Sequence, residues 1–221
     1  MAKIVLLGAG SSIFCKNVLG DCLLTPSLAD AEIALCDIDG EKLAQSERLI
    51  RRLNEKLGTR ATITASTDRR AVLKGADYVI NTISVGAYDP YIIADFEIPQ
   101  KYGLEQTVAD TLGVGGLFRG LRTIPVMLEI ARDMEELCPD AWLLNYTNPM
   151  AMLTGAMLRM TSVKAVGLCH SVQVCASTLL KHLDMPYDDQ VQWKIAGINH
   201  MAWLLDLRDK DGNDLYPEIR R

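Results

Sequence analysis

The chain has 221 residues, of which 49% are hydrophobic and 23% charged, and its formal net charge is −5. This composition is typical of a globular protein, and the length suits one large domain or one domain and part of a second. The sequence has no basic block and only strand-sized apolar runs, which argues against nucleic-acid binding and against a membrane protein.

The first half of the chain predicts strands that alternate with helices. The apolar run KIVLLGAG at the N-terminus reads as a buried strand, and residues 11–24 suit a helix that Ser11 or Ser12 caps. A second strand covers 31–37, and leucines and isoleucines at helical spacing predict a helix over 41–57. Further strands are expected at 62–66 and 77–82, with a short helix at 71–74 between them.

The alternation resumes after an irregular stretch. The expected elements are helices over 123–137, 151–160 and 172–183 and strands over 141–145 and 165–170. Strands that alternate with helices predict an α/β fold with a doubly wound, Rossmann-like parallel sheet. From Trp193 the pattern changes to antiparallel strands. We therefore expect a domain over 1–192 and, over 193–221, the beginning of an α+β second domain that is incomplete at Arg221.

The six cysteines are scattered and form no CxxC pair. The N-terminus lacks a signal peptide, because Gly8 and Gly10 interrupt its apolar run. We therefore expect a cytoplasmic protein with reduced cysteines, most of them small buried hydrophobes.

The first strand-to-helix turn suits a dinucleotide. Gly8 allows a tight turn, and Gly10 leaves room for a pyrophosphate, which the helix N-terminus at Ser11 and Ser12 would bind. The usual third glycine is Ile13, so the fingerprint is incomplete.

Asp37 ends the second strand, where a carboxylate can accept hydrogen bonds from a ribose diol and would repel a 2′-phosphate. This arrangement favours NAD over NADP. The alternative is a glycine-rich turn with an aspartate that caps a helix.

Polar residues also follow two later strands. Asn81 and Ser84 lie at the end of the fourth strand, and Asn145 and Asn148 lie at the end of the next long one. Ligands of open parallel sheets bind at the carboxyl ends of the strands. We therefore assign Asn81 and Ser84 to the cofactor and treat Asn148 as a substrate contact or a turn residue.

Cys169 and His170 are adjacent in GLCHS, at the end of the expected strand 165–170. Neighbouring side chains on a strand point to opposite faces, which argues against a Cys-His nucleophilic dyad. A thiolate and one imidazole are also two ligands short of a tetrahedral metal site. From spacing alone, metal ligation and burial in the core both remain open.

Several longer motifs resemble those of the NAD- and manganese-dependent glycoside hydrolases of family 4, particularly their alpha-galactosidase branch. They cover essentially the whole chain and occur in the order GAGSSIF, YGLEQTVADTLGVGGLFRGLRTIP, NYTNPMAM, GLCHSVQ and GINHMAW.

The resemblance implies an exception to two-carboxylate glycosidase chemistry. NAD⁺ takes hydride from the sugar C3, and a base then removes the acidified C2 proton while a divalent metal stabilises the negative charge. The C1–O bond breaks by elimination, water adds, and the hydride returns.

The resemblance also assigns residues. Cys169 and His200 would ligate the metal, and His170 would protonate the leaving oxygen. Asn148 would bind substrate, and Asp110 would raise the basicity of a catalytic tyrosine. That base would lie beyond Arg221, so the chain is expected to be a fragment, a truncated gene product or one piece of a split protein, without full activity by itself.

The stretch NTISVGAYDP contains no Arg or Lys, whereas members that act on 6-phosphorylated sugars carry an arginine there. A non-phosphorylated hexoside therefore fits better. The alternatives are a 2-hydroxyacid dehydrogenase of the lactate/malate kind and an NAD-binding remnant without turnover. A homodimer or homotetramer is expected.

Overall fold

The structure is a computed structural model that describes residues 1–107 and 110–221. It divides into two compact units, Met1–Leu168 and Cys169–Arg221. Along the chain the elements are β1 (Lys3–Leu7), α1 (Ser12–Leu24), η1 (Pro26–Leu28), β2 (Glu32–Cys36), α2 (Gly40–Leu57), β3 (Thr62–Ser66), α3 (Arg69–Leu73), β4 (Tyr78–Asn81), η2 (Ala87–Ile92), α4 (Ile93–Gln100), α5 (Gly113–Leu137), β5 (Trp142–Asn145), α6 (Met150–Met160), β6 (Lys164–Gly167), α7 (Ser171–His182), β7 (Gln192–Ile198), β8 (Met201–Arg208) and α8 (Tyr216–Ile219).

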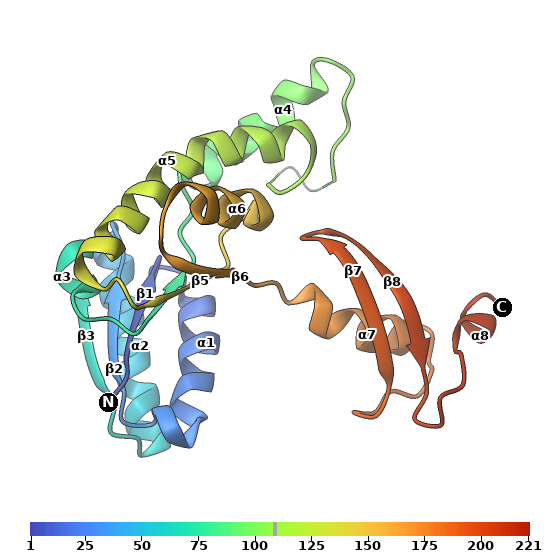
Figure 1. The fold of residues 1–221 in the computed structure, drawn as a ribbon, viewed down its shortest axis with the longest axis horizontal. Coiled ribbons are helices and arrows are strands. Elements are labelled where there is room, and N and C mark those ends of the chain that lie inside the picture. Colours follow the sequence, from blue (N-terminus) through green and yellow to red (C-terminus); the bar gives the residue numbers. More distant parts are fainter. Residues whose placement is uncertain (108–109) are drawn as a thin grey trace. The chain divides into compact units, whose positions relative to one another are not determined.

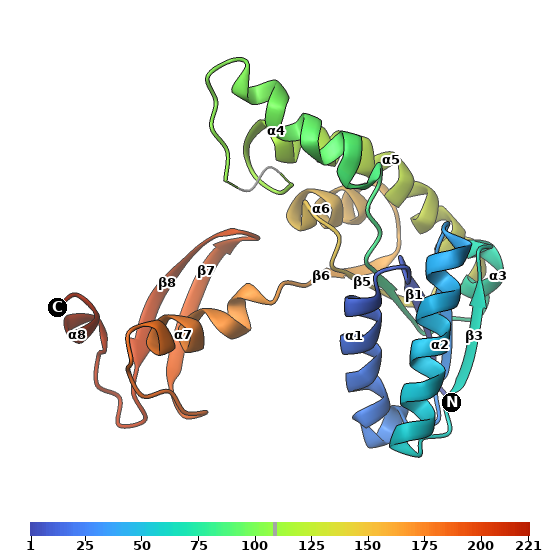
Figure 2. The same ribbon diagram turned by 180° about the vertical axis from the view of Figure 1, so that it is seen from behind.

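The first unit is a parallel sheet with the strand order β3-β2-β1-β4-β5-β6 (Figure 1). The order reverses beside β1, which pairs with both β2 and β4. Helices α1 and α2 lie side by side along one face (Figure 2), and α3, α5 and α6 contribute the core of the other face. The predicted doubly wound sheet is confirmed.

Strand β1 shows why the sheet needs helices on both faces. Ile4 and Leu6 belong to the core that α1 and α2 cover, whereas Val5 and Leu7 belong to the opposite core. All four side chains are at most 2% exposed. Alternate residues of a strand point to opposite faces, so a strand apolar throughout must be buried on both sides.

Aspartates begin two helices that follow strands. Asp39 caps α2, where its side chain accepts hydrogen bonds from the amides of Glu41 and Lys42. Asp68 caps α3 in the same way. These bonds satisfy amides that lack a partner within the helix, and they set the helix starts at Gly40 and Arg69, close to the predicted ones.

Helix α5 starts at Gly113 rather than at the predicted Thr123. Glycines between 113 and 120 weaken the helical signal, but the packing requires two of them. A Cβ on Gly116 would overlap the carbonyl carbon of Thr111, and one on Gly120 would lie 3.2 Å from Sδ of Met152. The glycines therefore let this part of α5 approach the preceding loop and α6.

The expected irregular stretch also contains η2 and α4, which run along the N-terminal half of α5 (Figures 1 and 2). Arg122 of α5 joins these elements. Its Nη2 lies 2.7 Å from Oδ2 of Asp95, its Nε donates to the carbonyl of Val85, and its guanidinium lies over the ring of Tyr91. Asp95 is 2% exposed and the side chain of Arg122 is 19% exposed, so the carboxylate of this ion pair is buried while the arginine partly reaches solvent.

Backbone hydrogen bonds connect the carboxyl ends of neighbouring strands, and we call this row the rim. Along it, the last carbonyls of β1, β2, β4 and β5 each accept a hydrogen bond from an amide just beyond the end of a neighbouring strand. The rim consists of Gly8 to Cys36, Thr82 to Leu7, Tyr146 to Asn81 and Leu168 to Asn145, each written donor first and each 2.9 Å long.

The second unit packs α7 against the antiparallel hairpin of β7 and β8. Ala176, Leu180 and Leu207 are its fully buried centre. Because α7 contacts this hairpin, it belongs to the second unit, and the boundary between the two units falls between Leu168 and Cys169. The sequence analysis placed α7 in a domain that ends at residue 192.

An ion-pair cluster joins α3 to α5. Nε of Arg69 donates to Oδ2 of Asp133 at 2.7 Å, and Arg70 pairs with the other carboxylate oxygen and with Glu136. Burial favours a higher pKa for Asp133, but the hydrogen bonds from Arg69 and Arg70 outweigh it and hold that pKa below its ordinary value.

The lowered pKa of Asp133 predicts a pH-dependent contribution to stability. The contribution is fully present above the unfolded-state pKa, about 3.9, and is lost as pH falls through the lower folded-state pKa. Asp133→Asn should cost about 1–3 kcal/mol of unfolding free energy at neutral pH. In urea titrations of both proteins, this difference should shrink below about pH 4. A difference that stays constant down to the acid transition would contradict this assignment.

None of the helices within the described ranges combines the length and the apolar character that a membrane crossing requires.

Candidate functional site

The first strand-to-helix turn has the backbone that the sequence predicts. Gly8 has φ +86°, and a Cβ there would lie 2.7 Å from the carbonyl carbon of Thr82. Ser11 is the N-cap of α1, and in the described part of the chain its side chain makes no capping hydrogen bond. Ser12 starts the helix, and both serines are exposed. The helix N-terminus is therefore not occupied by a capping side chain.

Asp37 lies beside this turn and shapes it. Its Oδ2 accepts a hydrogen bond from the amide of Gly10 at 2.7 Å, and its Oδ1 accepts one from Asp39 at 2.9 Å. A Cβ on Gly10 would lie 2.8 Å from Oδ2. Gly10 thus makes room for the Asp37 carboxylate, in addition to the room for a phosphate that the sequence suggested. A carboxylate has about four acceptor positions, so both oxygens can still accept ribose hydroxyls.

Asn81 lies below the surface of the carboxyl edge. It is 0% exposed, and its Nδ2 lies 3.0 Å from both Oδ1 of Asn145 and Oγ1 of Thr147. Asn145 in turn reaches Oγ1 of Thr154 on α6. This buried polar network joins β4, β5 and α6, so the observed contacts of Asn81 are structural and its role toward a cofactor stays a prediction.

Three other predicted residues meet at Arg119, which the sequence analysis did not single out. Its Nε donates to the carbonyl of Asn148 at 3.1 Å, its Nη1 lies 3.4 Å from Oδ2 of Asp110, and its Nη2 lies 3.5 Å from Oγ of Ser84. Arg119 is 8% exposed. Burial lowers the pKa of its guanidinium, while the charge of Asp110 acts in the opposite direction. The sequence signal that could have identified Arg119 is a charged residue inside the otherwise apolar, glycine-rich stretch GVGGLFRGL.

Cys169 and His170 are not on a strand, so the predicted strand 165–170 is wrong at its end. Among the described residues β6 pairs with β5 alone, and it stops at Gly167 because the residue paired with it, Asn145, is the end of β5. His170 has helical dihedral angles and is the N-cap of α7, and the amide of Ser171 donates to Sγ of Cys169 at 3.4 Å. The argument that these neighbours point to opposite faces therefore does not apply.

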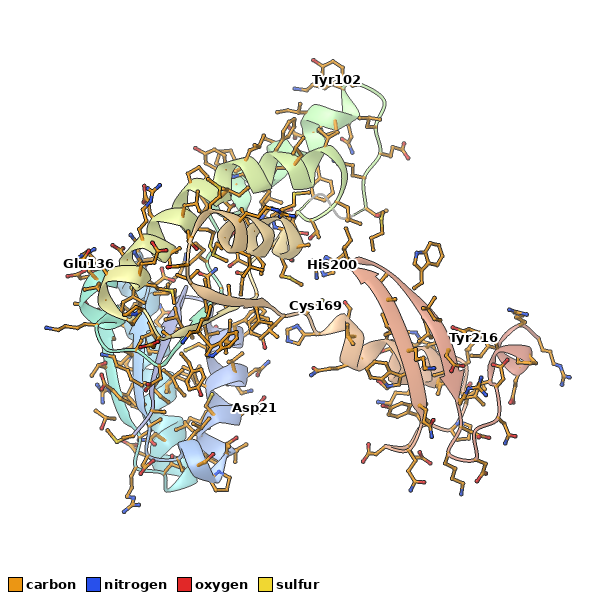
Figure 3. The ribbon with its side chains drawn as sticks, in the orientation of Figure 1. Asp21, Tyr102, Glu136, Cys169, His200 and Tyr216 are labelled. Carbon is orange, nitrogen blue, oxygen red and sulfur yellow. The ribbon has the colours of Figure 1, made fainter. Side chains whose placement is uncertain are left out.

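His200 lies in the two-residue turn between β7 and β8 (Figure 3). Its φ of 62° is in the left-handed region, which costs a non-glycine residue roughly 1–2 kcal/mol. Such strain persists where the surrounding structure demands it and often marks functional sites.

Within the second unit, the hairpin turn and the N-terminus of α7 lie at the same end in both views (Figures 1 and 2). The segments that carry His200 and Cys169 therefore lie toward the same end of this unit. Among residues 1–107 and 110–221, no group of three or more His, Cys, Asp or Glu side chains is placed to hold a metal ion. Cys169 and His200 are thus at most two of the ligands that a complete metal site needs.

Two family models match the chain. One, described as family 4 glycosyl hydrolase, matches residues 3–185, and the other, the C-terminal domain of the same family, matches residues 195–221.

Curated relatives match the chain over nearly its whole length. An alpha-galactosidase from Bacillus subtilis is 59% identical over 221 residues, which are 100% of this chain and 51% of the relative. An alpha-glucosidase from Erwinia rhapontici is 39% identical over 99% of this chain and 48% of its own length. The chain spans about half the length of the curated relatives it matches.

Among solved structures, a 6-phospho-beta-glucosidase from Thermotoga maritima, solved with manganese, NAD⁺ and glucose-6-phosphate, has a TM-score of 0.84 and 25% identity. The match covers 99% of this chain and 52% of that one.

Proposed function

The chain belongs to family 4 of the glycosyl hydrolases. On that premise we propose that it acts in the hydrolysis of alpha-galactosides. We propose that this reaction uses NAD and a divalent metal, for which manganese is the first candidate. The observation that carries the proposal is the 59% identity with an alpha-galactosidase along the entire chain. Both matching family models describe glycosyl hydrolases, which favours hydrolysis over 2-hydroxyacid oxidation.

The first unit fits NAD. The turn at Gly8 and the N-terminus of α1 present backbone amides to a pyrophosphate. Asp37 retains acceptor positions for a ribose diol. When bound, NAD⁺ supplies a hydride acceptor; the residues of this chain hold it at the point where the strand order reverses.

The second unit supplies two of the donors that a divalent metal needs. A thiolate and an imidazole suit several transition metals, whereas manganese favours oxygen ligands. Cys169 and His200 therefore fit a metal whose remaining ligands are oxygens of the substrate and water. The metal would supply electrostatic stabilisation of negative charge on those oxygens.

The remaining roles follow the family resemblance. His170, exposed at the N-cap of α7, would give a proton to the leaving oxygen. Asn148 would bind the sugar, and Asp110 would support the base. Residues 82–92 carry no Arg or Lys, and the charge of nearby Arg119 is opposed by Asp110. This charge balance favours a neutral sugar over a phosphorylated one.

Incubation in D₂O with NAD⁺, Mn²⁺ and a nitrophenyl alpha-galactoside tests the proposal. The released galactose should carry deuterium at C2, because the mechanism removes and replaces that proton. A matched sample from which NAD and metal have been removed should release no nitrophenol.

Other outcomes of this assay point to other functions. Hydrolysis without deuterium at C2, or hydrolysis that survives removal of NAD and metal, would contradict the elimination mechanism. NAD binding without hydrolysis would favour a binding remnant, and accumulation of NADH with a hydroxy acid would favour a dehydrogenase.

A further inference from the structure

We propose that Arg119 is a positioning residue for sugar binding. From its buried position it holds the Asp110 carboxylate and the Asn148 backbone in place. This inference rests on the proposed function, because it assigns a sugar to that site. Arg119 acts through the groups that it holds and not by contact with the ligand.

The two charged side chains differ in exposure. The side chain of Arg119 is 9% exposed, whereas that of Asp110 is 32% exposed. A ligand that approaches from solvent therefore meets the carboxylate, and the guanidinium lies beneath it. Oγ1 of Thr111 donates to Oδ1 of Asp110 at 2.8 Å, while Arg119 faces Oδ2. Both carboxylate oxygens are thus oriented by the protein.

The helix that carries Arg119 is built to reach these groups. Gly116 and Gly120 are four residues apart and share one face of α5. A Cβ on Gly116 would clash with the carbonyl of Thr111, next to Asp110, and one on Gly120 would lie 3.5 Å from Cγ of Pro149, next to Asn148. The close approach that these glycines allow brings Nε of Arg119 within 3.1 Å of the Asn148 carbonyl.

The pairing also defines the ligand class. The oriented carboxylate of Asp110 can accept hydrogen bonds from sugar hydroxyls. The positive charge of Arg119 beside it balances the negative charge of this carboxylate. A neutral sugar suits this pair, because a sugar phosphate would face the exposed carboxylate.

A double-mutant cycle tests the role of Arg119. Methyl alpha-galactoside is titrated calorimetrically into the chain with NAD⁺ and Mn²⁺ present. Arg119→Met, which keeps the aliphatic stem, should weaken sugar binding about tenfold or more, which corresponds to about 1.4 kcal/mol. Asp110→Asn should weaken it similarly, and the double variant should be no weaker than either single one. Arg119→Lys should recover part of the affinity.

NAD⁺ affinity is the readout that separates positioning from general damage. It should stay within about twofold in every variant, because Ser84, which was assigned to the cofactor, lies 3.5 Å from Nη2 of Arg119, beyond the usual length of a hydrogen bond. Arg132→Met is the matched control, since Arg132 is an exposed arginine of the same helix, and it should change neither affinity.

Each remaining outcome decides the question. Unchanged sugar affinity in Arg119→Met, additive losses in the double variant, or parallel loss of NAD⁺ affinity would overturn the role of Arg119. If Arg119→Met does not fold, the comparison of Arg119→Lys with Asp110→Asn takes its place. An unaltered chain that binds NAD⁺ but no sugar would instead contradict the proposed function itself.

Discussion

Replacement of Gly8 by alanine should lower the free energy of unfolding by at least about 3 kcal/mol, among the largest effects of a single substitution. The backbone of Gly8 has φ +86°, which disfavours any side chain. In addition, the new Cβ would lie 2.7 Å from the carbonyl carbon of Thr82 and 2.8 Å from the amide nitrogen of Ile83. Both are backbone atoms beyond β4, so β1 and β4 would have to separate. Urea titration measures the loss, and NAD⁺ affinity should fall with it.

Gly58→Ala separates the cost of the backbone dihedral angle from the cost of the steric contact. Gly58 also has a left-handed backbone, with φ +67°, but apart from Gly58 and its two chain neighbours no heavy atom of the described residues lies within 4 Å of the position that its Cβ would take. It should therefore cost only about 1 kcal/mol, the price of the dihedral angle alone. Equal losses for the two variants would show that the contact with Thr82 and Ile83 has no energetic consequence.

Removal of the Arg122 guanidinium, by Arg122→Met, should cost about 3–5 kcal/mol, because it leaves a buried carboxylate without its counter-charge. Asp95 is 2% exposed and binds Arg122 through two hydrogen bonds, of 2.7 and 3.2 Å. The guanidinium also holds the Val85 carbonyl and stacks on Tyr91. The loss should appear in urea unfolding and as faster amide exchange in α4, since Arg122 joins that helix to α5.

The double variant Arg122→Met, Asp95→Asn tests this explanation. Without the carboxylate there is no unpaired buried charge, so the double variant should be more stable than Arg122→Met alone. If it is less stable by the sum of the single losses, the two groups do not interact energetically.

The sequence predicts the sheet well because its strands are apolar on both faces. Val5 and Leu7 belong to one core and Ile4 and Leu6 to the other, and only a sheet covered on both sides gives such a run a stable position. The first ten residues of α5 escaped prediction because their glycines serve close packing with Thr111 and Met152. A propensity rule reads those glycines as helix breakers.

The candidate site was predicted less completely, and the reason is distance along the chain. The turn at Gly8 and Asp37 follow from local pattern. A second group of residues depends on how α5 packs on two loops that are distant in the sequence. A short stretch of sequence does not reveal this packing. The group consists of Ser84, Asp110, Arg119 and Asn148. The end of β6 depends on where β5 stops, so the geometry expected of Cys169 and His170 was wrong although the residues themselves had been noticed.

The rim has a consequence for how such a chain can diverge. Its bonds run from backbone amide to backbone carbonyl, and these groups are the same whatever side chains are attached. Substitutions in the loops above can therefore accumulate while the platform beneath them keeps its shape. A platform of this kind is compatible with the different sugars that the names of two relatives carry, an alpha-galactosidase and an alpha-glucosidase. In this chain the backbone holds the scaffold, and the side chains that the scaffold displays can change without breaking the rim.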